Sequence, residues 1–207
     1  LFLERPLSSH QERLWFIEKF EAGTLYAASP VYHNIPVVLR VAGELDGERM
    51  QRAAAVLPER HESLRTSFPD RESSAIQRVN ESAELTVEEH DGEEVGEALI
   101  ARALRDVERP FDLQAPPLLR VSWYPRGEES LLVLTGHHIV VDRSSLEVLA
   151  SDLATLYSAD RQDCLPELAL QYIDYAEWVA GLSSEVLEPL QFYWKRKLGE
   201  RLSLIHI

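Results

Sequence analysis

Two adjacent histidines and an aspartate lie in residues 136–142, which read GHHIVVD. They follow the apolar run 131–134 and precede Arg143-Ser144-Ser145, where the apolar pattern stops. An imidazole has an unperturbed pKa of about 6.5, so its neutral form can accept a proton near physiological pH. Side chains at strand ends and in the following loops often point into clefts. The segment is therefore a candidate site for proton transfer.

A metal site is the first alternative, because histidine and aspartate are common metal ligands. Adjacent residues on an extended segment point to opposite sides, so His137 and His138 cannot easily share one ion with Asp142. We therefore expect no metal at this segment. Cys164 is the only cysteine, and no histidine lies near it in sequence. We expect it to be a partly buried small residue rather than a nucleophile.

The surrounding sequence predicts a hairpin that delivers the two histidines. Residues 118–124 and 130–136 have strand composition, and residues 125–128 (PRGE) are typical of a turn. Further strands are predicted at 35–41, near 76–79 and near 85–89. Ser144 and Glu147 have capping-box spacing, which predicts that a helix starts directly after the loop.

Several more helices are predicted around this hairpin. One begins at Ser8 or Ser9, because Ser8 has capping-box spacing to Gln11 and Ser9 has it to Glu12. A second, capped by Asp46, should bend or end at Pro58, which removes an amide donor and clashes with the preceding turn. Helical sequence follows Ala98, and two late helices carry apolar faces. We expect part of these late faces to be exposed, at Tyr175, Phe192 and Trp194.

Composition limits the classes of partner. The chain has 207 residues, of which 45% are hydrophobic and 27% charged, and a formal net charge of −14. Such an acidic surface repels phosphate backbones and anionic membranes, so we expect no nucleic acid and no membrane partner. A single cysteine and the lack of a signal-peptide pattern suit a cytoplasmic protein. Since the first residue is not methionine, we expect a piece of a longer protein.

Four ordered stretches resemble the condensation domain of nonribosomal peptide synthetases, a member of the chloramphenicol-acetyltransferase-like superfamily. They are SSHQERLWF (8–16), RHESLRTSF (60–68), HHIVVDR (137–143) and YIDYAEW (172–178). The resemblance implies an α/β fold, with a mixed β-sheet flanked by helices and an incomplete second lobe. Residues 1–165 would form the N-terminal lobe and residues 166–201 the start of the C-terminal lobe. Residues 202–207 fit no pattern, and we expect them to be a non-native tail.

The resemblance also implies a reaction, in which the amine of an acceptor aminoacyl thioester attacks a donor acyl or peptidyl thioester. Both substrates would be carried on the 4′-phosphopantetheine of upstream and downstream peptidyl carrier domains, with an adenylation domain in the same polypeptide and no cofactor bound directly. His138 matches the family's catalytic histidine, as a general base or as a group that positions the amine. His137 would be structural.

Two further positions follow from the same match. Asp142 would pair with Arg65 and fix the loop, and losing one member of a buried pair costs about 3–5 kcal/mol. Arg143 stands where the family usually has glycine. The arginine side chain would fill space near the substrate unless it points to solvent.

Two alternatives stay open at this level. An epimerisation domain of the same superfamily shares the two histidines and the aspartate, and a non-catalytic carrier-docking module could carry Arg143 as its disabling change. The 207-residue chain alone is expected to be inactive, because half of the substrate tunnel would be missing.

Overall fold

The computed structural model describes residues 2–25, 30–70, 75–90, 96–126 and 128–198. Its centre is a four-stranded mixed sheet in the order β2-β7-β6-β5. Strands β2 (Asn34–Ala42), β7 (Glu129–His137) and β6 (Leu119–Arg126) are antiparallel neighbours, whereas β5 (Val87–Glu89) runs parallel to β6. Strands β6 and β7 form the predicted hairpin, which brings His137 to the end of the sheet.

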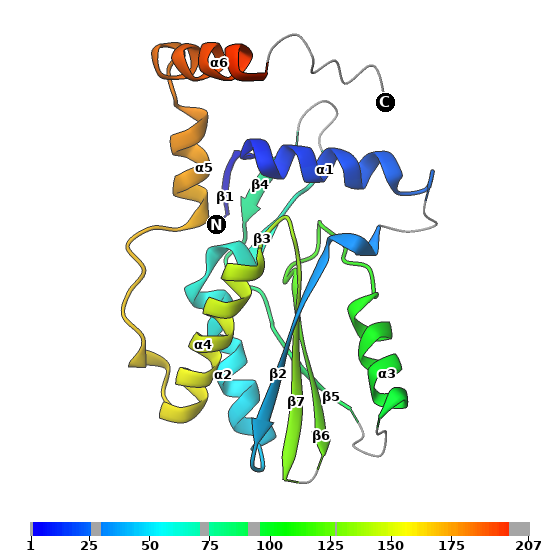
Figure 1. The fold of residues 1–207 in the computed structure, drawn as a ribbon. Coiled ribbons are helices and arrows are strands. Elements are labelled where there is room, and N and C mark those ends of the chain that lie inside the picture. Colours follow the sequence, from blue (N-terminus) through cyan, green and yellow to red (C-terminus); the bar gives the residue numbers. More distant parts are fainter. Residues whose placement is uncertain (1, 26–29, 71–74, 91–95, 127, 199–207) are drawn as a thin grey trace.

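Helices cover both faces of this sheet (Figure 1). On one face α2 (Gly47–Arg60) and α4 (Arg143–Ala159) pack against Trp123, Leu132 and Leu134. On the other face α3 (Glu97–Val107) places Leu99 against Tyr124 and Val133. The two sets of strand residues alternate along β6 and β7, as expected for a sheet that is buried on both sides.

A smaller sheet, in the order β1-β4-β3, lies beside the central one. It contains β1 (Leu3–Pro6), β4 (Ile76–Val79) and β3 (Thr66–Ser67), and β3 directly follows the short helix η2 (Glu62–Arg65). Helix α1 (Ser9–Glu21) begins with the predicted capping box between Ser8 and Gln11. A separate cluster that includes Leu14, Phe68 and Ile139 ties α1 to the loop after β7.

Two helix boundaries differ from the predictions. Helix α2 continues two residues past Pro58 and ends at Arg60. Proline at this point removes a single hydrogen bond near the helix end, and burial of Ala54 and Leu57 keeps the last turn packed. Helix α4 begins at Arg143 and is capped by Asp142, so the predicted capping box between Ser144 and Glu147 is wrong.

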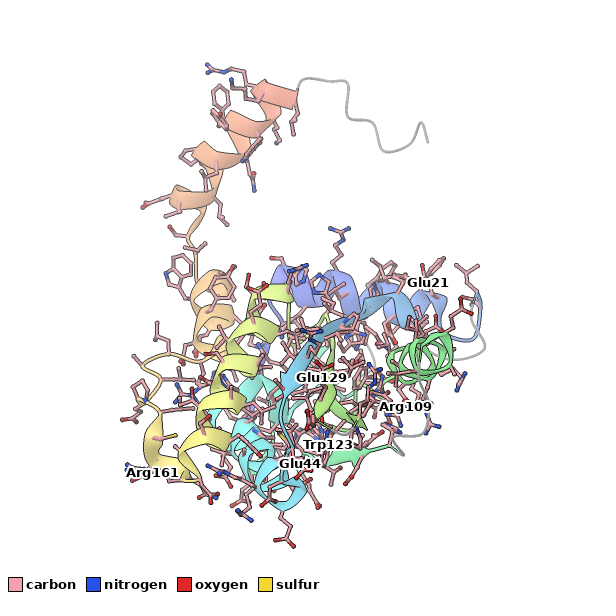
Figure 2. The ribbon with its side chains drawn as sticks, turned by 60° about the horizontal axis from the view of Figure 1, so that its bottom comes forward. Glu21, Glu44, Arg109, Trp123, Glu129 and Arg161 are labelled. Carbon is pink, nitrogen blue, oxygen red and sulfur yellow. The ribbon has the colours of Figure 1, made fainter. Side chains whose placement is uncertain are left out.

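The late helices are α5 (Tyr172–Ala180) and α6 (Ser184–Leu198), and a short helix η3 (Gln162–Cys164) precedes them. Helix α5 contacts β1, whereas α6 stands clear of the body in both views (Figures 1 and 2). The predicted exposure is confirmed, since Tyr175 is 51%, Phe192 67% and Trp194 56% exposed. Residues 202–207 lie outside the described residues. Within the described residues, no helix has the length and apolar character that crossing a bilayer requires.

Candidate active site

The end of β7 is held by backbone hydrogen bonds to the segments that lead into both neighbouring strands. His137 pairs with Asn34 of β2, and its N–H donates to the carbonyl of Leu118, the residue before β6, at 3.0 Å. The N–H of His138 donates to the carbonyl of His33 at 2.9 Å. His33 ends the short helix η1 (Val31–His33), which leads directly into β2. The backbone at the two histidines is therefore fixed on both sides.

The loop fixes the tautomer of His138. Its Nδ1 lies 3.0 Å from the carbonyl oxygen of Val141, which can only accept a hydrogen bond. Nδ1 therefore carries the proton, and Nε2 of the neutral ring keeps its lone pair. The ring is part-buried and lines an open cavity of about 400 Å³. Nε2 is thus the atom that can accept a proton from a group in this cavity.

His137 has the opposite tautomer and points to the opposite side. Its Nδ1 accepts a hydrogen bond from the N–H of Ile139 at 3.1 Å, so its Nε2 carries the proton. This Nε2 faces the carboxylate of Glu18 in α1 at 3.6 Å. The side chain is 1% exposed, and burial lowers the pKa of the imidazole, which favours its neutral form. His137 is placed to anchor the loop against α1 and not to meet a substrate.

Glu18, His33 and His137 form a buried cluster whose potential metal-ligand atoms all lie within 4.8 Å of one another. Nδ1 of His33 lies 3.3 Å from Oε2 of Glu18, the same oxygen that His137 faces. A metal ligand needs a lone pair, yet the Nε2 of His137 carries a proton because Nδ1 is occupied by Ile139. The donor atoms as arranged therefore do not fit an ion. The cluster fits a buried anchor in which the carboxylate of Glu18 in α1 hydrogen-bonds to His33 of η1 and faces His137 at the end of β7.

Glu18 and His33 were missed as site residues by the sequence analysis. A signal was present for Glu18, because Gln11, Leu14 and Glu18 recur at the spacing of one helix face. A charged residue on the buried face of a helix needs a partner. The identity of its two partners, His33 fifteen residues later and His137 more than one hundred residues later, was not readable from the same pattern.

The cavity beside His138 has walls from three parts of the chain. The first turn of α1, the loop after β7 with the start of α4, and one face of α5 line it. The hydroxyls of Ser8 and Tyr172 lie 2.7 Å apart and join α1 to α5 at its edge. Tyr172 thus borders the cavity, whereas Trp178 of the same helix is 63% exposed.

Asp142 caps a helix instead of forming the predicted ion pair. Its Oδ1 accepts hydrogen bonds from the N–H and the hydroxyl of Ser145, both at 2.7 Å. The bonds from Ser145 lower the pKa of the Asp142 carboxyl. Carboxylates at this position are favoured because the first N–H groups of a helix lack internal partners. Asp142 therefore fixes the junction between the histidine loop and α4.

Arg65 lies elsewhere, so its predicted pairing with Asp142 is wrong. Its guanidinium donates to Glu62 at 2.8 Å and to the carbonyl of Asn80 at 2.6 Å. Among the described residues, no ion pair within 4.0 Å joins it to Asp142. Glu62 lies in the same turn as Arg65, and Asn80 lies directly after β4, so both acceptors are closer to Arg65 in the chain than Asp142 is. Arg65 braces η2 and β4 and does not clamp the histidine loop.

A double-mutant cycle on Asp142 and Arg65 tests this correction. Asp142→Ala should lower the free energy of unfolding by about 1 kcal/mol, the usual effect of losing an N-cap. Arg65→Ala should add its own effect independently, with a coupling below about 0.5 kcal/mol. Urea unfolding of the chain and its three variants measures both. A coupling energy of several kcal/mol would instead show that Asp142 and Arg65 form the ion pair.

Arg143 points to solvent. It is the first residue of α4, its side chain is 85% exposed, and it pairs with Glu147 at 3.2 Å. Its backbone is not in the left-handed region that favours glycine, and it does not line the cavity. The residue that stands where the family usually has glycine therefore leaves the cavity beside His138 open.

Arg60 and His61, which begin the RHESLRTSF stretch, bind one carboxylate. Both contact Oδ2 of Asp152 in α4, at 3.0 and 2.8 Å. Arg60 also donates to the carbonyl of Pro166, and this contact joins the end of α2 to the segment that leads to α5.

Comparison with known proteins assigns the family. The model of the condensation domain family matches residues 4–207. The chain belongs to the condensation domain family. The dimodular nonribosomal peptide synthase of Bacillus subtilis (strain 168) is 38% identical over 203 residues, which are 93% of this chain and 8% of that protein. Gramicidin S synthase 2 of Aneurinibacillus migulanus is 33% identical over 205 residues, which are 98% of this chain and 4% of that protein. The predicted family is thus confirmed, and the chain spans a small part of each of these curated relatives.

Solved structures confirm the fold class. The X-domain from teicoplanin biosynthesis, also solved in a complex with OxyB, is 29% identical with a TM-score of 0.71, covering 97% of this chain and 40% of that one. The starter condensation domain of rhizomide synthetase RzmA has a TM-score of 0.79 at 19% identity, over 97% of this chain and 49% of that one. The predicted chloramphenicol-acetyltransferase-like lobe is therefore present, and the chain spans less than half of each solved relative.

Proposed function

We propose that this chain is the first part of a peptide-bond-forming condensation domain of a nonribosomal peptide synthetase. Residues 1–165 are its N-terminal lobe, and residues 166–201 begin its C-terminal lobe. The observation that carries the proposal is the tautomer of His138, whose Nε2 keeps a lone pair beside a cavity of about 400 Å³. A chain of this family with that atom so placed can accept the proton that amide formation releases.

The reaction joins a donor acyl or peptidyl thioester to an acceptor aminoacyl thioester. The amine nitrogen attacks the thioester carbonyl carbon, the carbon–sulfur bond breaks, and the departing thiolate takes up a proton. Because a thioester is already activated, much of the rate comes from holding amine and carbonyl together. Nε2 of His138 takes the proton from the attacking nitrogen and passes it to the sulfur. The chain itself binds no cofactor in this scheme, since 4′-phosphopantetheine arrives on carrier domains as part of each substrate.

The partners follow from the same scheme. Upstream and downstream peptidyl carrier domains deliver the two substrates, and an adenylation domain in the same polypeptide loads the acceptor. The protein works in the cytoplasm, where carriers and amino acids are available. His137 and Asp142 support the loop that carries His138, whereas Arg65 braces η2 and β4 and Arg143 points to solvent.

Reconstitution with two loaded carrier proteins tests the proposal. The native synthetase module that carries this sequence should form a dipeptidyl thioester, detected by mass spectrometry of the acceptor carrier. The 207-residue chain alone should form none, because α6 and the open side of the cavity lack their covering. Absence of dipeptide from the module would overturn the proposed function. Dipeptide formation by the isolated chain would contradict the expectation that residues outside the chain are needed for activity.

A carrier-docking module is the second candidate. The observation that favours a docking role is that the similar X-domain from teicoplanin biosynthesis has been solved in a complex with another protein, OxyB. Carrier binding by the module without dipeptide would support docking. Exchange of the α-hydrogen of a bound aminoacyl group in heavy water, without peptide formation, would support epimerisation instead.

A further inference from the structure

A second imidazole faces the same cavity as His138. His10 lies in the first turn of α1, and its ring centroid is 5.0 Å from that of His138, with the ring planes at 75°. Both rings line the cavity of about 400 Å³. His10 is exposed, and its ring makes no hydrogen bond with any other part of the chain that the structure describes. Its nitrogens are therefore accessible from the cavity.

Amide formation requires the removal of two protons from the acceptor nitrogen. An α-amino group has a pKa of about 7.7–8.0 and is mostly an ammonium ion at neutral pH, with no lone pair for attack. One proton must leave before the carbon–nitrogen bond forms, and a second must leave as the amide nitrogen becomes neutral. His138 accounts for the second proton in the proposed function.

We propose that His10 is a further catalytic residue, which binds the acceptor ammonium group and removes its first proton. This inference rests on the proposed function. His10 takes the proton, the ammonium becomes a neutral amine, and the protonated imidazole returns the proton to water. The amine then attacks the donor carbonyl beside His138, and the second proton passes through His138 to the leaving thiolate. Every proton is thereby accounted for.

The surroundings keep the His10 ring neutral before substrate arrives. Burial, then repulsion from His138 and Arg13, lowers the pKa of His10, and Asp142 opposes this effect. The ring also sits at the N-terminal end of α1, where the helix dipole disfavours a positive charge. The other titratable side chains that line the cavity are the phenols of Tyr172 and Tyr175 on α5. A neutral imidazole is the form that accepts a proton from an ammonium ion.

The test is the pH dependence of dipeptide formation by the native module. We expect His10→Ala to lower kcat/KM for the acceptor about tenfold at pH 6.5, because only the small neutral fraction of the amine then reacts. Near pH 8.5 the amine is mostly neutral by itself, so the loss should fall below about twofold. His10→Asn should behave like His10→Ala, because an amide does not take up a proton.

Two controls separate proton removal from structure. Glu12→Gln, two residues further along on the exposed side of α1, should leave the profile unchanged. Added imidazole should restore His10→Ala more at pH 6.5 than at pH 8.5, since the site is open to solvent. An equal loss of kcat/KM at both pH values, or no loss at either, would overturn the role of His10. The proposed function would still stand if the parent module forms dipeptide. A parent module that forms no dipeptide overturns both.

Discussion

Replacing His138 with alanine should lower the rate of peptide-bond formation by the native module by about 10²–10⁴-fold, the usual contribution of a positioned base. The reason is geometric, because Nδ1 is held by Val141 at 3.0 Å and Nε2 is left with the lone pair beside the cavity. Single-turnover formation of dipeptidyl thioester with saturating carriers measures the chemical step. A rate within twofold of the parent module would contradict the role of His138.

His138→Gln separates the two roles that the sequence left open. A glutamine can accept a hydrogen bond from the amine, yet it cannot take up its proton. If His138 is a general base, the glutamine variant is as slow as the alanine variant. If His138 only positions the amine, the glutamine variant keeps most of the rate. Both variants should keep the fold, since the lost bond to Val141 contributes about 1 kcal/mol.

Replacing Gly136 with alanine should destabilise the chain by about 2–3 kcal/mol, the upper part of the range for overpacking. A methyl group there would lie 2.3 Å from Cγ2 of Val141 and 3.5 Å from Cδ2 of Leu146. Val141 is β-branched and 4% exposed, so its side chain has little room to turn away. Any shift of Val141 also moves the carbonyl that holds His138, so activity of the module should fall as well. Urea unfolding gives the stability change.

The double variant Gly136→Ala, Val141→Ala tests whether this single contact is responsible. Removing the valine methyls makes room for the new one, so the double variant should be more stable than the sum of the two single effects by over about 1 kcal/mol. Gly181→Ala is the matched control, because its new methyl would meet only ordinary contacts of 3.5 Å and 3.6 Å. It should change stability by less than about 0.5 kcal/mol. Strict additivity in the double variant would show that the strain lies elsewhere.

The elements around the site were predictable from local sequence. The β6–β7 hairpin, the capping box of Ser8 and Gln11, and the exposed late aromatics all follow from patterns a few residues long. Alternation along a strand also placed His137 and His138 on opposite sides. Patterns of this length have a direct physical cause in backbone geometry, which is why they were readable.

The partners of the charged groups were not predictable in the same way. From the sequence, Asp142 was assigned one role, as the partner of Arg65, and the helix cap was assigned to Ser144, whereas Asp142 is the N-cap of α4. The choice depends on which donor lies nearer in space, and the N–H of Ser145 lies at 2.7 Å. Glu18 and His137 meet only because α1 packs over the end of β7, a tertiary contact that no local pattern encodes.

The groups that hold His138 all precede α5 in the chain. The carbonyls of His33 and Val141 bind its backbone and its ring, and Asp142 secures the start of the helix that follows. Domains fold as units while the ribosome is still extending the chain. In a nascent chain the contacts of the His138 ring can therefore form before α5 and α6 leave the ribosome, and the wall of the cavity that α5 supplies is added afterwards.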